Sequence, residues 1–198
     1  MIPKPSRFYY FLGAVSLPVL RLLYRLEAHG LENLPAEGGY VLAANHVSSF
    51  DPWPLGIPLW PRRFLRFMAK SELYWWPLRY LLDAGGAFPV RRGQADLEAI
   101  EAGAELARAG HVVAMFPEGT RRRKGLRKKH EARPRTGAAR IALLAGVPLV
   151  PAAIKGTDRL LRLGRLKVVY GEPLPPEGKP QELTDRLMAE IERRYESL

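Results

Sequence analysis

The sequence predicts an α/β protein with a single-layer, mixed and largely parallel sheet that is flanked by helices. Short apolar runs typical of buried strands alternate with helical patterns along the chain, which is the pattern of α/β layer folds. Titratable and charged residues follow several of these runs, and the carboxyl ends of strands are where such folds place their ligand-binding and active sites. A length of 198 residues suits one domain with a substantial core, so we expect a single domain at 31–198 after an N-terminal segment at 1–30.

The N-terminal segment 1–30 is expected to associate with a membrane. Residues 8–24 carry no charge except Arg21, but this run has 17 residues and contains Pro18, whereas roughly 20 apolar residues are needed to cross a bilayer. No small-residue cleavage site typical of a signal peptide follows it. A shallow, interfacial or re-entrant anchor therefore fits better than a crossing helix, and a buried core helix is the alternative.

The first part of the domain is predicted to contain two strands joined through a helix. A buried strand is expected at 39–44, where an apolar run includes a β-branched and an aromatic residue. Asp51 and Pro52 have the pattern of a helix start, with Asp51 as the N-cap. A second strand is expected at 64–69.

An aromatic stretch at 72–82 is expected to be helical in part. Its adjacent residues Trp75 and Trp76 cannot both face one core. We expect one of them to contact lipid or an acyl chain, and ordinary core packing is the alternative.

The next elements continue the alternation of strand and helix. A turn at 85–86 leads into a short strand that ends at Arg91, and a helix with one apolar stripe is predicted at 94–109. A buried strand is expected at 111–116. The stretch 121–135 then carries nine Lys or Arg residues and one acidic residue, so it is expected to be an exposed loop.

The last elements are two strands between two helices. A helix is predicted at 137–145 with Thr136 as its cap, and an amphipathic helix at 181–196. Strands are expected at 147–154 and 166–170. The two prolines within 147–154 favour irregular pairing or an edge position.

The composition narrows the possible function classes. The formal net charge of +11 points to polyanionic partners: nucleic acid, an anionic lipid surface or phosphorylated substrates. The absence of Cys excludes disulfides, thiolate nucleophiles and zinc sites of the Cys type. The four His residues are too scattered to indicate a metal cluster, and we expect neither a metal nor a cofactor.

His46 and Asp51 are the candidate catalytic residues, because a titratable base and a carboxylate lie close together between a strand and a helix start. On one continuous helix their side chains would point about 140° apart. They can meet only if 47–50 turn back, and Ser48 and Ser49 favour such a turn. A carboxylate on one ring nitrogen of His46 fixes the tautomer and leaves the other nitrogen as a general base. The alternative is a surface turn with a solvated His and an N-cap Asp.

Four sequence blocks occur in order from residue 45 to residue 151. Residues 45–51 have the pattern NHxxxxD, 85–91 have the pattern GxxFxxR, 116–121 read FPEGTR, and 147–151 form a proline-bearing block. Together they resemble the glycerolipid acyltransferase family, and within it the bacterial 1-acylglycerol-3-phosphate (lysophosphatidate) acyltransferases. The resemblance implies a sheet like that of glycerol-3-phosphate acyltransferases.

The resemblance also implies transfer of a fatty acyl group from acyl-CoA or acyl carrier protein to the free hydroxyl of lysophosphatidic acid, giving phosphatidic acid. In such a reaction His46 is expected to act as the general base and Asp51 to orient its ring, so no protein nucleophile is required. Arg91 and Arg121, expected at neighbouring strand ends, hold the acceptor phosphate. Lys70 resembles a basic position that follows the first block in this family, and it is expected to stabilise developing charge or to bind the donor phosphates. The other block positions assigned to substrate binding are Phe88, Glu118, Gly119 and Thr120.

The expected location is the cytoplasmic face of the cell membrane, with peripheral or shallow attachment. The basic residues after Thr120 exceed what the FPEGTR block needs. Attraction to anionic headgroups explains them, at about 1 kcal/mol per basic residue near an anionic membrane, and an acidic carrier protein is a second expected partner.

Three other functions remain as alternatives. The charge allows a nucleic-acid-binding protein, although no recognition helix, RNA-binding signature or zinc finger is present, and we expect no nucleic-acid partner. A hydrolase would use His46 and Asp51 with Ser48 or Ser49 as its nucleophile. A third alternative keeps the acyl transfer and replaces the acceptor with another lysolipid.

Overall fold

The computed structural model describes residues 5–90, 96–118 and 134–198. The strands in these ranges are β1 (Glu27–His29), β2 (Tyr40–Ala44), β3 (Leu65–Lys70), β4 (Ala87–Val90), β5 (Val112–Met115), β6 (Leu149–Lys155) and β7 (Lys167–Tyr170). The α-helices are α1 (Arg7–Leu22), α2 (Pro52–Gly56), α3 (Leu78–Ala84), α4 (Asp96–Arg108), α5 (Gly137–Ala145) and α6 (Pro180–Ser197). Short 3-10 helices are η1 (Leu31–Asn33), η2 (Ile57–Leu59), η3 (Ser71–Leu73) and η4 (Thr157–Arg162).

The described strands form one seven-stranded sheet in the order β1-β7-β6-β2-β5-β3-β4. Each pair of neighbouring strands is parallel except β6 and β7, which are antiparallel. The predicted α/β class and the mixed, largely parallel sheet are therefore confirmed.

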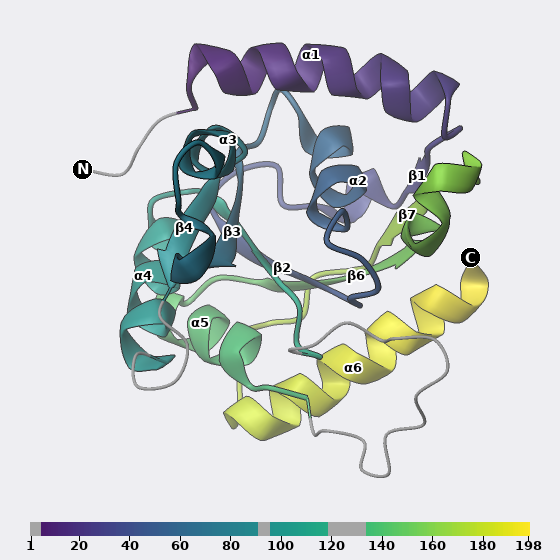
Figure 1. Ribbon diagram of the computed structural model, residues 1–198. Helices are drawn as coiled ribbons and strands as arrows, with labels where there is room; N and C mark the ends of the chain where they lie inside the picture. Colours follow the sequence, from purple (N-terminus) through teal and green to yellow (C-terminus); the bar gives the residue numbers. More distant parts are fainter. Residues whose placement is uncertain (1–4, 91–95, 119–133) are drawn as a thin grey trace, which may run out of the picture.

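Helices cover both faces of this sheet (Figure 1). On β2, Tyr40, Leu42 and Ala44 pack into one core with residues of α2 and η2. Val41 and Ala43 point the other way, into a core formed with α4, α5 and α6. Because β2 is buried on both faces, its sequence is a continuous apolar run without the alternation of a half-exposed strand.

Strand β6 corrects the expectation of irregular or edge pairing. It pairs with β2 on one side and β7 on the other, despite Pro151. The carbonyl of Pro151 accepts from Gly171 N at 2.7 Å, and the ladder with β7 begins only at the next residue, Ala152. Since the N–H and C=O of one strand residue point to the same side, the missing N–H of Pro151 faces β7 just outside the paired residues of this ladder.

Two further differences concern short elements. Strand β1, which pairs with β7 in parallel, was not predicted, because three residues are too few to show a periodicity. Helix α5 has the predicted bounds, but the Thr136 side chain makes no capping hydrogen bond. The predicted basic loop 121–135 lies outside the described residues except for its last two positions.

Helix α1 lies on the outside of the molecule, and of its residues only Gly13 and Leu20 are buried. It is not the buried core helix that was the alternative expectation. Its exposed large apolar side chains are Phe8, Tyr10, Phe11, Val15 and Leu22. Among the described residues, none of the helices has both the length and the apolar character needed to cross a bilayer.

The aromatic stretch is helical in part, as predicted, because η3 and α3 lie at its two ends. Trp75 and Trp76 lie in the connection between them, and their side chains are 58% and 74% exposed. Neither Trp therefore packs in the core, and the alternative of core packing is wrong for both.

Candidate active site

The candidate site begins where β2 ends, and Asn45 fixes that point. Its side-chain N–H donates to the Ile154 carbonyl at 2.9 Å, and its side-chain oxygen accepts from Ile154 N at 2.8 Å. Because Asn45 is buried, this two-way pairing locks the first residue after β2 to the neighbouring strand β6. The next residue, His46, therefore leaves the sheet from a fixed position.

The turn after His46 folds back, as predicted, and brings His46 and Asp51 together. Asp51 Oδ2 lies 2.8 Å from His46 Nδ1 and accepts from the backbone N–H groups of Val47 at 2.7 Å and Ser48 at 2.9 Å. Its other oxygen, Oδ1, accepts from the Thr157 hydroxyl at 2.6 Å. A fully buried carboxylate is stable when it has several donors, and these hydrogen bonds satisfy both oxygens of Asp51.

Asp51 does not cap the following helix, so that prediction was wrong. Helix α2 does begin at Pro52, but Asp51 itself has helical backbone angles (φ −53°, ψ −38°) and makes no side-chain capping bond. Its carboxylate points back toward His46, because the donors of the turn and of Thr157 converge there.

The geometry suits His46 to accept a proton at Nε2. With Asp51 accepting from Nδ1–H, the neutral ring carries its lone pair on Nε2, and the carboxylate stabilises the imidazolium that forms when Nε2 takes a proton. The ring stacks on Phe116, with 4.3 Å between centroids and 24° between planes. It remains 18% exposed, so a substrate can reach it.

Phe116 and Thr157 are site residues that the sequence did not reveal as such. Phe116 follows β5 and belongs to the FPEGTR block, but nothing in that block indicates that its ring stacks on His46. Thr157 begins η4, more than a hundred residues from Asp51, and no sequence pattern connects the two.

The hydrolase alternative gains no support from this turn. The hydroxyl of Ser48 accepts from Phe50 N, and its backbone N–H donates to Asp51. Ser49 is exposed. The hydrogen bonds of the described residues place neither serine hydroxyl on the ring of His46.

The structure describes only some of the other predicted site residues. Glu118, after β5, is half-buried with both carboxylate oxygens buried. Phe88, in β4, lies in the core with Leu106 and Val113. Lys70 is the last residue of β3. The predicted positions that lie outside the described residues are Arg91, Gly119, Thr120 and Arg121.

The strands that carry these blocks end at one edge of the sheet. Strands β2, β5, β3 and β4 are parallel, so their carboxyl ends lie on the same side, where α/β folds place ligands. However, β3 lies between β5 and β4. The strands before Arg91 and Arg121 are therefore not neighbours, which corrects the expectation of neighbouring strand ends.

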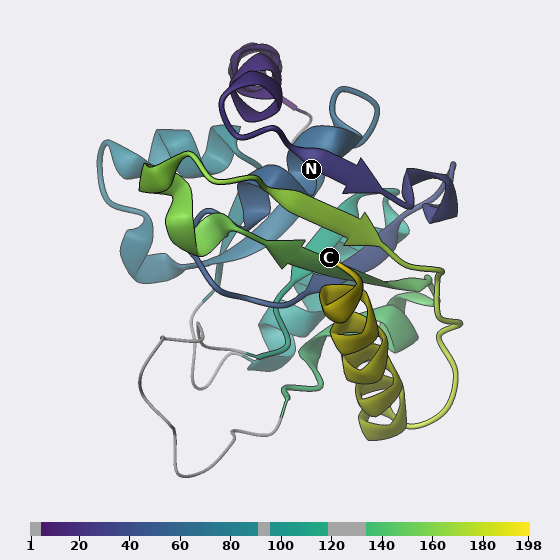
Figure 2. The same ribbon diagram turned by 90° about the vertical axis from the view of Figure 1, so that its right-hand side faces the viewer.

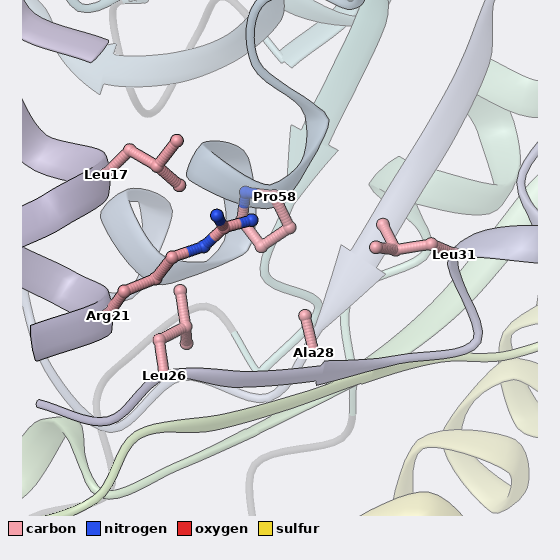
Figure 3. Close-up of a pocket in the computed structure, with 6 residues that line it drawn as sticks. All are labelled: Leu17, Arg21, Leu26, Ala28, Leu31 and Pro58. Atoms are coloured by element: carbon pink, nitrogen blue, oxygen red, sulfur yellow. The ribbon is translucent and has the colours of Figure 1, made fainter. Parts of the chain in front are cut away.

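A small cavity of about 230 Å³ lies between α1, β1 and η2 (Figure 3). The Arg21 side chain extends across it between Leu17, Leu26 and Pro58. None of the candidate site residues lines this cavity, so we do not assign it to the active site.

Comparison with known proteins agrees with the fold and with the four blocks. Residues 25–155, more than half of the chain, match the family model described as Acyltransferase. The 1-acyl-sn-glycerol-3-phosphate acyltransferase of Bacillus subtilis (strain 168) is 33% identical over 172 residues, covering 84% of this chain and 82% of that protein. A chloroplastic 1-acyl-sn-glycerol-3-phosphate acyltransferase of Arabidopsis thaliana is 26% identical over 185 residues, and this chain matches 50% of its length.

A solved structure shows the same fold. The crystal structure of the 1-acyl-sn-glycerophosphate (LPA) acyltransferase PlsC from Thermotoga maritima matches with a TM-score of 0.66 and 24% sequence identity, covering 96% of this chain and 92% of that one. The chain described here belongs to the acyltransferase family. Within that family it is an O-acyltransferase, and the resemblance drawn from the four blocks is confirmed.

Proposed function

We propose that this protein moves a fatty acyl group from an acyl thioester to the free hydroxyl of lysophosphatidic acid and so makes phosphatidic acid for phospholipid synthesis. The observation that carries the proposal is the His46–Asp51 pair, held at 2.8 Å at the carboxyl end of β2. The acceptor is supported by the similarity to the Bacillus subtilis protein, whose name gives 1-acyl-sn-glycerol-3-phosphate as its substrate. The donor is acyl-CoA or an acyl carrier protein.

The reaction needs one proton acceptor and no covalent enzyme intermediate. His46 Nε2 takes the proton of the acceptor hydroxyl while the hydroxyl oxygen attacks the thioester carbonyl carbon, and Asp51 stabilises the imidazolium. When the tetrahedral intermediate collapses, the C–S bond breaks and the imidazolium returns its proton to the leaving sulfur. The thioester is already activated, so the proposed reaction uses no metal and no cofactor.

The phosphate of the acceptor needs cations, and we assign this role to Arg91 and Arg121. Arginine binds phosphate with two parallel hydrogen bonds, which fixes the position of the glycerol as well as its charge. Glu118 is assigned to the acceptor glycerol or to Arg121. Further substrate contacts are proposed for Lys70, Phe88, Gly119 and Thr120.

We also propose that the protein works at the cytoplasmic face of the membrane, attached peripherally or inserted shallowly. The exposed apolar side chains of α1 support this location, because they suit the headgroup boundary of a bilayer. The net charge of +11 supports it too, because the cytoplasmic leaflet has a negative surface potential.

The test is a transfer assay with purified protein in detergent. Acyl-CoA and acyl carrier protein are each paired with lysophosphatidic acid, other lysophospholipids, glycerol 3-phosphate and no acceptor. We expect phosphatidic acid as the product, and a rate lowered by about 10²–10⁴-fold in His46→Ala. Release of free fatty acid without an acceptor would show a hydrolase, and preference for another lysolipid would replace the acceptor.

The acceptor-phosphate role is tested with Arg121→Ala. Because the lost cation contacts only the acceptor in this proposal, the KM for lysophosphatidic acid is expected to rise by about tenfold or more while the donor KM stays nearly constant. Steady-state kinetics with each substrate varied in turn measure both constants. Equal effects on the two substrates would contradict the assignment.

A further inference from the structure

A second cationic site adjoins the catalytic turn. A cavity of about 540 Å³ lies beside Val47, the residue that follows His46. Its other walls come from the end of β6, from η4, from the start of β7 and from the end of α6, which lie together in Figure 2. Its basic lining residues are Lys155, Arg159, Arg165 and Lys167.

The antiparallel pairing of β6 and β7 gathers these cations. Lys155, the last residue of β6, lies opposite Lys167, the first residue of β7. Arg159 and Arg165 belong to the connection between the two strands. Because this connection leaves and re-enters the sheet at one edge, all four side chains surround one space.

Each of these four cations has a nearby partner, but the partners do not neutralise all four positive charges. Glu27 lies 3.5 Å from both Arg165 and Lys167, and Asp158 lies 3.6 Å from Arg159. Lys155 lies over the ring of Tyr195, 5.4 Å from its centroid. Among the side chains, four cations thus face two carboxylates, and this excess of positive charge favours an anion.

The cavity and the catalytic pair share one turn of the backbone. Gly156 lines the cavity, and the next residue, Thr157, donates to Asp51. Gly156 has a φ of +100°, and a Cβ placed on it would lie 2.2 Å from the Arg165 carbonyl oxygen, so only glycine allows this close approach. The same connection therefore shapes the cavity and positions the carboxylate that holds His46.

The sheet order separates this cavity from the strand ends assigned to the acceptor, along the same edge of the sheet. His46 follows β2, with β6 and β7 on one side of that strand and β5, β3 and β4 on the other. In the proposed function the acceptor phosphate binds after β5 and β4. Two anionic substrates must reach His46 together, and separate cationic sites on opposite sides of it avoid repulsion between their charges.

We propose that the cavity formed by Lys155, Arg159, Arg165 and Lys167 binds the phosphate of the donor's phosphopantetheine arm. This inference rests on the proposed function. Acyl-CoA and acyl carrier protein both carry this arm, so the shared ligand is a phosphate with a thioester at the far end. Lys70 lies at the end of β3, on the acceptor side of β2. Of its two expected roles, this proposal leaves the stabilisation of developing charge and removes the binding of the donor phosphate.

The kinetic test compares two double variants with the same change in net charge. Lys155→Ala/Arg159→Ala removes two cations from the cavity, and Arg186→Ala/Arg193→Ala removes two exposed cations from α6 as the control. We expect the first pair to raise the donor KM about tenfold or more, because charge-assisted hydrogen bonds to the phosphate are lost. The KM for lysophosphatidic acid and the control variant should be unchanged.

A binding test without turnover separates this proposal from the proposed function. Calorimetry in a His46→Ala background measures binding of coenzyme A in one experiment and of holo acyl carrier protein in a second, parallel arm of the test. The affinity should be lowered by about tenfold in the Lys155→Ala/Arg159→Ala variant and unchanged in the control variant. The arm that shows the loss identifies the source of the phosphate. Unchanged affinity in both arms, or an equal rise in the acceptor KM, overturns the proposal. If the wild type transfers no acyl group but coenzyme A binding still depends on Lys155 and Arg159, the proposed function fails and this site stands.

Discussion

The carboxylate of Asp51 both closes the turn at 47–51 and holds the ring of His46. Its Oδ2 closes the turn by accepting from Val47 and Ser48 and also holds His46, while Oδ1 connects the turn to Thr157. A histidine acts as a base only when its tautomer and orientation are fixed, so in the proposed mechanism the stability of the turn and the activity of the ring depend on the same atoms.

Asp51→Asn should lower kcat by about 10²-fold or more, because an amide cannot stabilise the imidazolium and presents N–H groups to donors on one side. The KM values should change little, since Asp51 contacts no substrate in this mechanism. Steady-state kinetics measure these constants, and near-UV circular dichroism confirms that the variant is folded. Thr157→Val, which leaves the His46–Asp51 pair intact, should have a smaller effect, and a full kcat in Asp51→Asn would contradict the general-base role.

His111 offers a prediction about pH and stability. Burial lowers the pKa of His111 from its ordinary value of 6.5, and the charge of Arg66 lowers it further. The unfolded chain therefore binds a proton at a higher pH than the folded one, so the free energy of unfolding falls as the pH drops through this range. Urea unfolding at about pH 7 and about pH 5 should show a smaller loss in His111→Gln than in the wild type. Equal losses in both proteins would show that His111 does not carry the effect.

At the scale of elements, α1 has an outer face whose apolar side chains are exposed in the described fold. Phe8, Phe11 and Val15 lie three and four residues apart, so they share one face of the helix, and all are exposed. On the inner side, Gly13 allows close contact with Trp60, because a Cβ there would lie 2.3 Å from the indole nitrogen. Tyr9 and Leu20 also pack against the domain, so the helix is attached along its inner side and presents an aromatic surface outward.

Phe8→Ser/Phe11→Ser should weaken partition onto anionic vesicles by at least about tenfold, since burying a Phe side chain contributes roughly 1.5–3 kcal/mol. Vesicle co-sedimentation measures the partition. The matched control is Leu97→Ser/Leu144→Ser, which changes exposed apolar residues of α4 and α5 on the opposite face of the sheet. Equal losses in the two variants would argue against α1 as the attachment.

At the scale of the whole molecule, charge and apolar surface contribute separately to the proposed membrane attachment. The net charge of +11 acts over a distance that salt shortens, from about 10 Å at 0.1 M to about 3 Å at 1 M. The apolar contribution of α1 does not weaken with salt. The two contributions can therefore be measured one at a time.

Wild-type binding to anionic vesicles should weaken as salt rises from about 0.1 M to about 1 M, and should then level off at a residual value. Phe8→Ser/Phe11→Ser should lack that residual binding, because only the electrostatic attraction remains in it. Binding to neutral vesicles should be weak and independent of salt. Co-sedimentation across a salt series measures all three, and salt-independent binding to anionic vesicles would contradict the electrostatic part.

The sequence by itself determined the local features of this protein. The fold class, the bounds of α5, the buried β2 and the return of Asp51 to His46 were all predicted, because periodicity and turn chemistry act over a few residues. The FPEGTR and NHxxxxD blocks also indicated the family for the same reason, since each block is contiguous.

Only the tertiary structure decided how these pieces are combined. An apolar run does not reveal which strands lie beside it, so the position of β3 between β5 and β4 and the place of Pro151 in an interior strand became visible only in the sheet. The contacts of Thr157 with Asp51 and of Ile154 with Asn45 join residues more than a hundred positions apart. Such contacts form because buried polar groups must find donors and acceptors wherever packing brings them, and that requirement leaves no pattern along the chain.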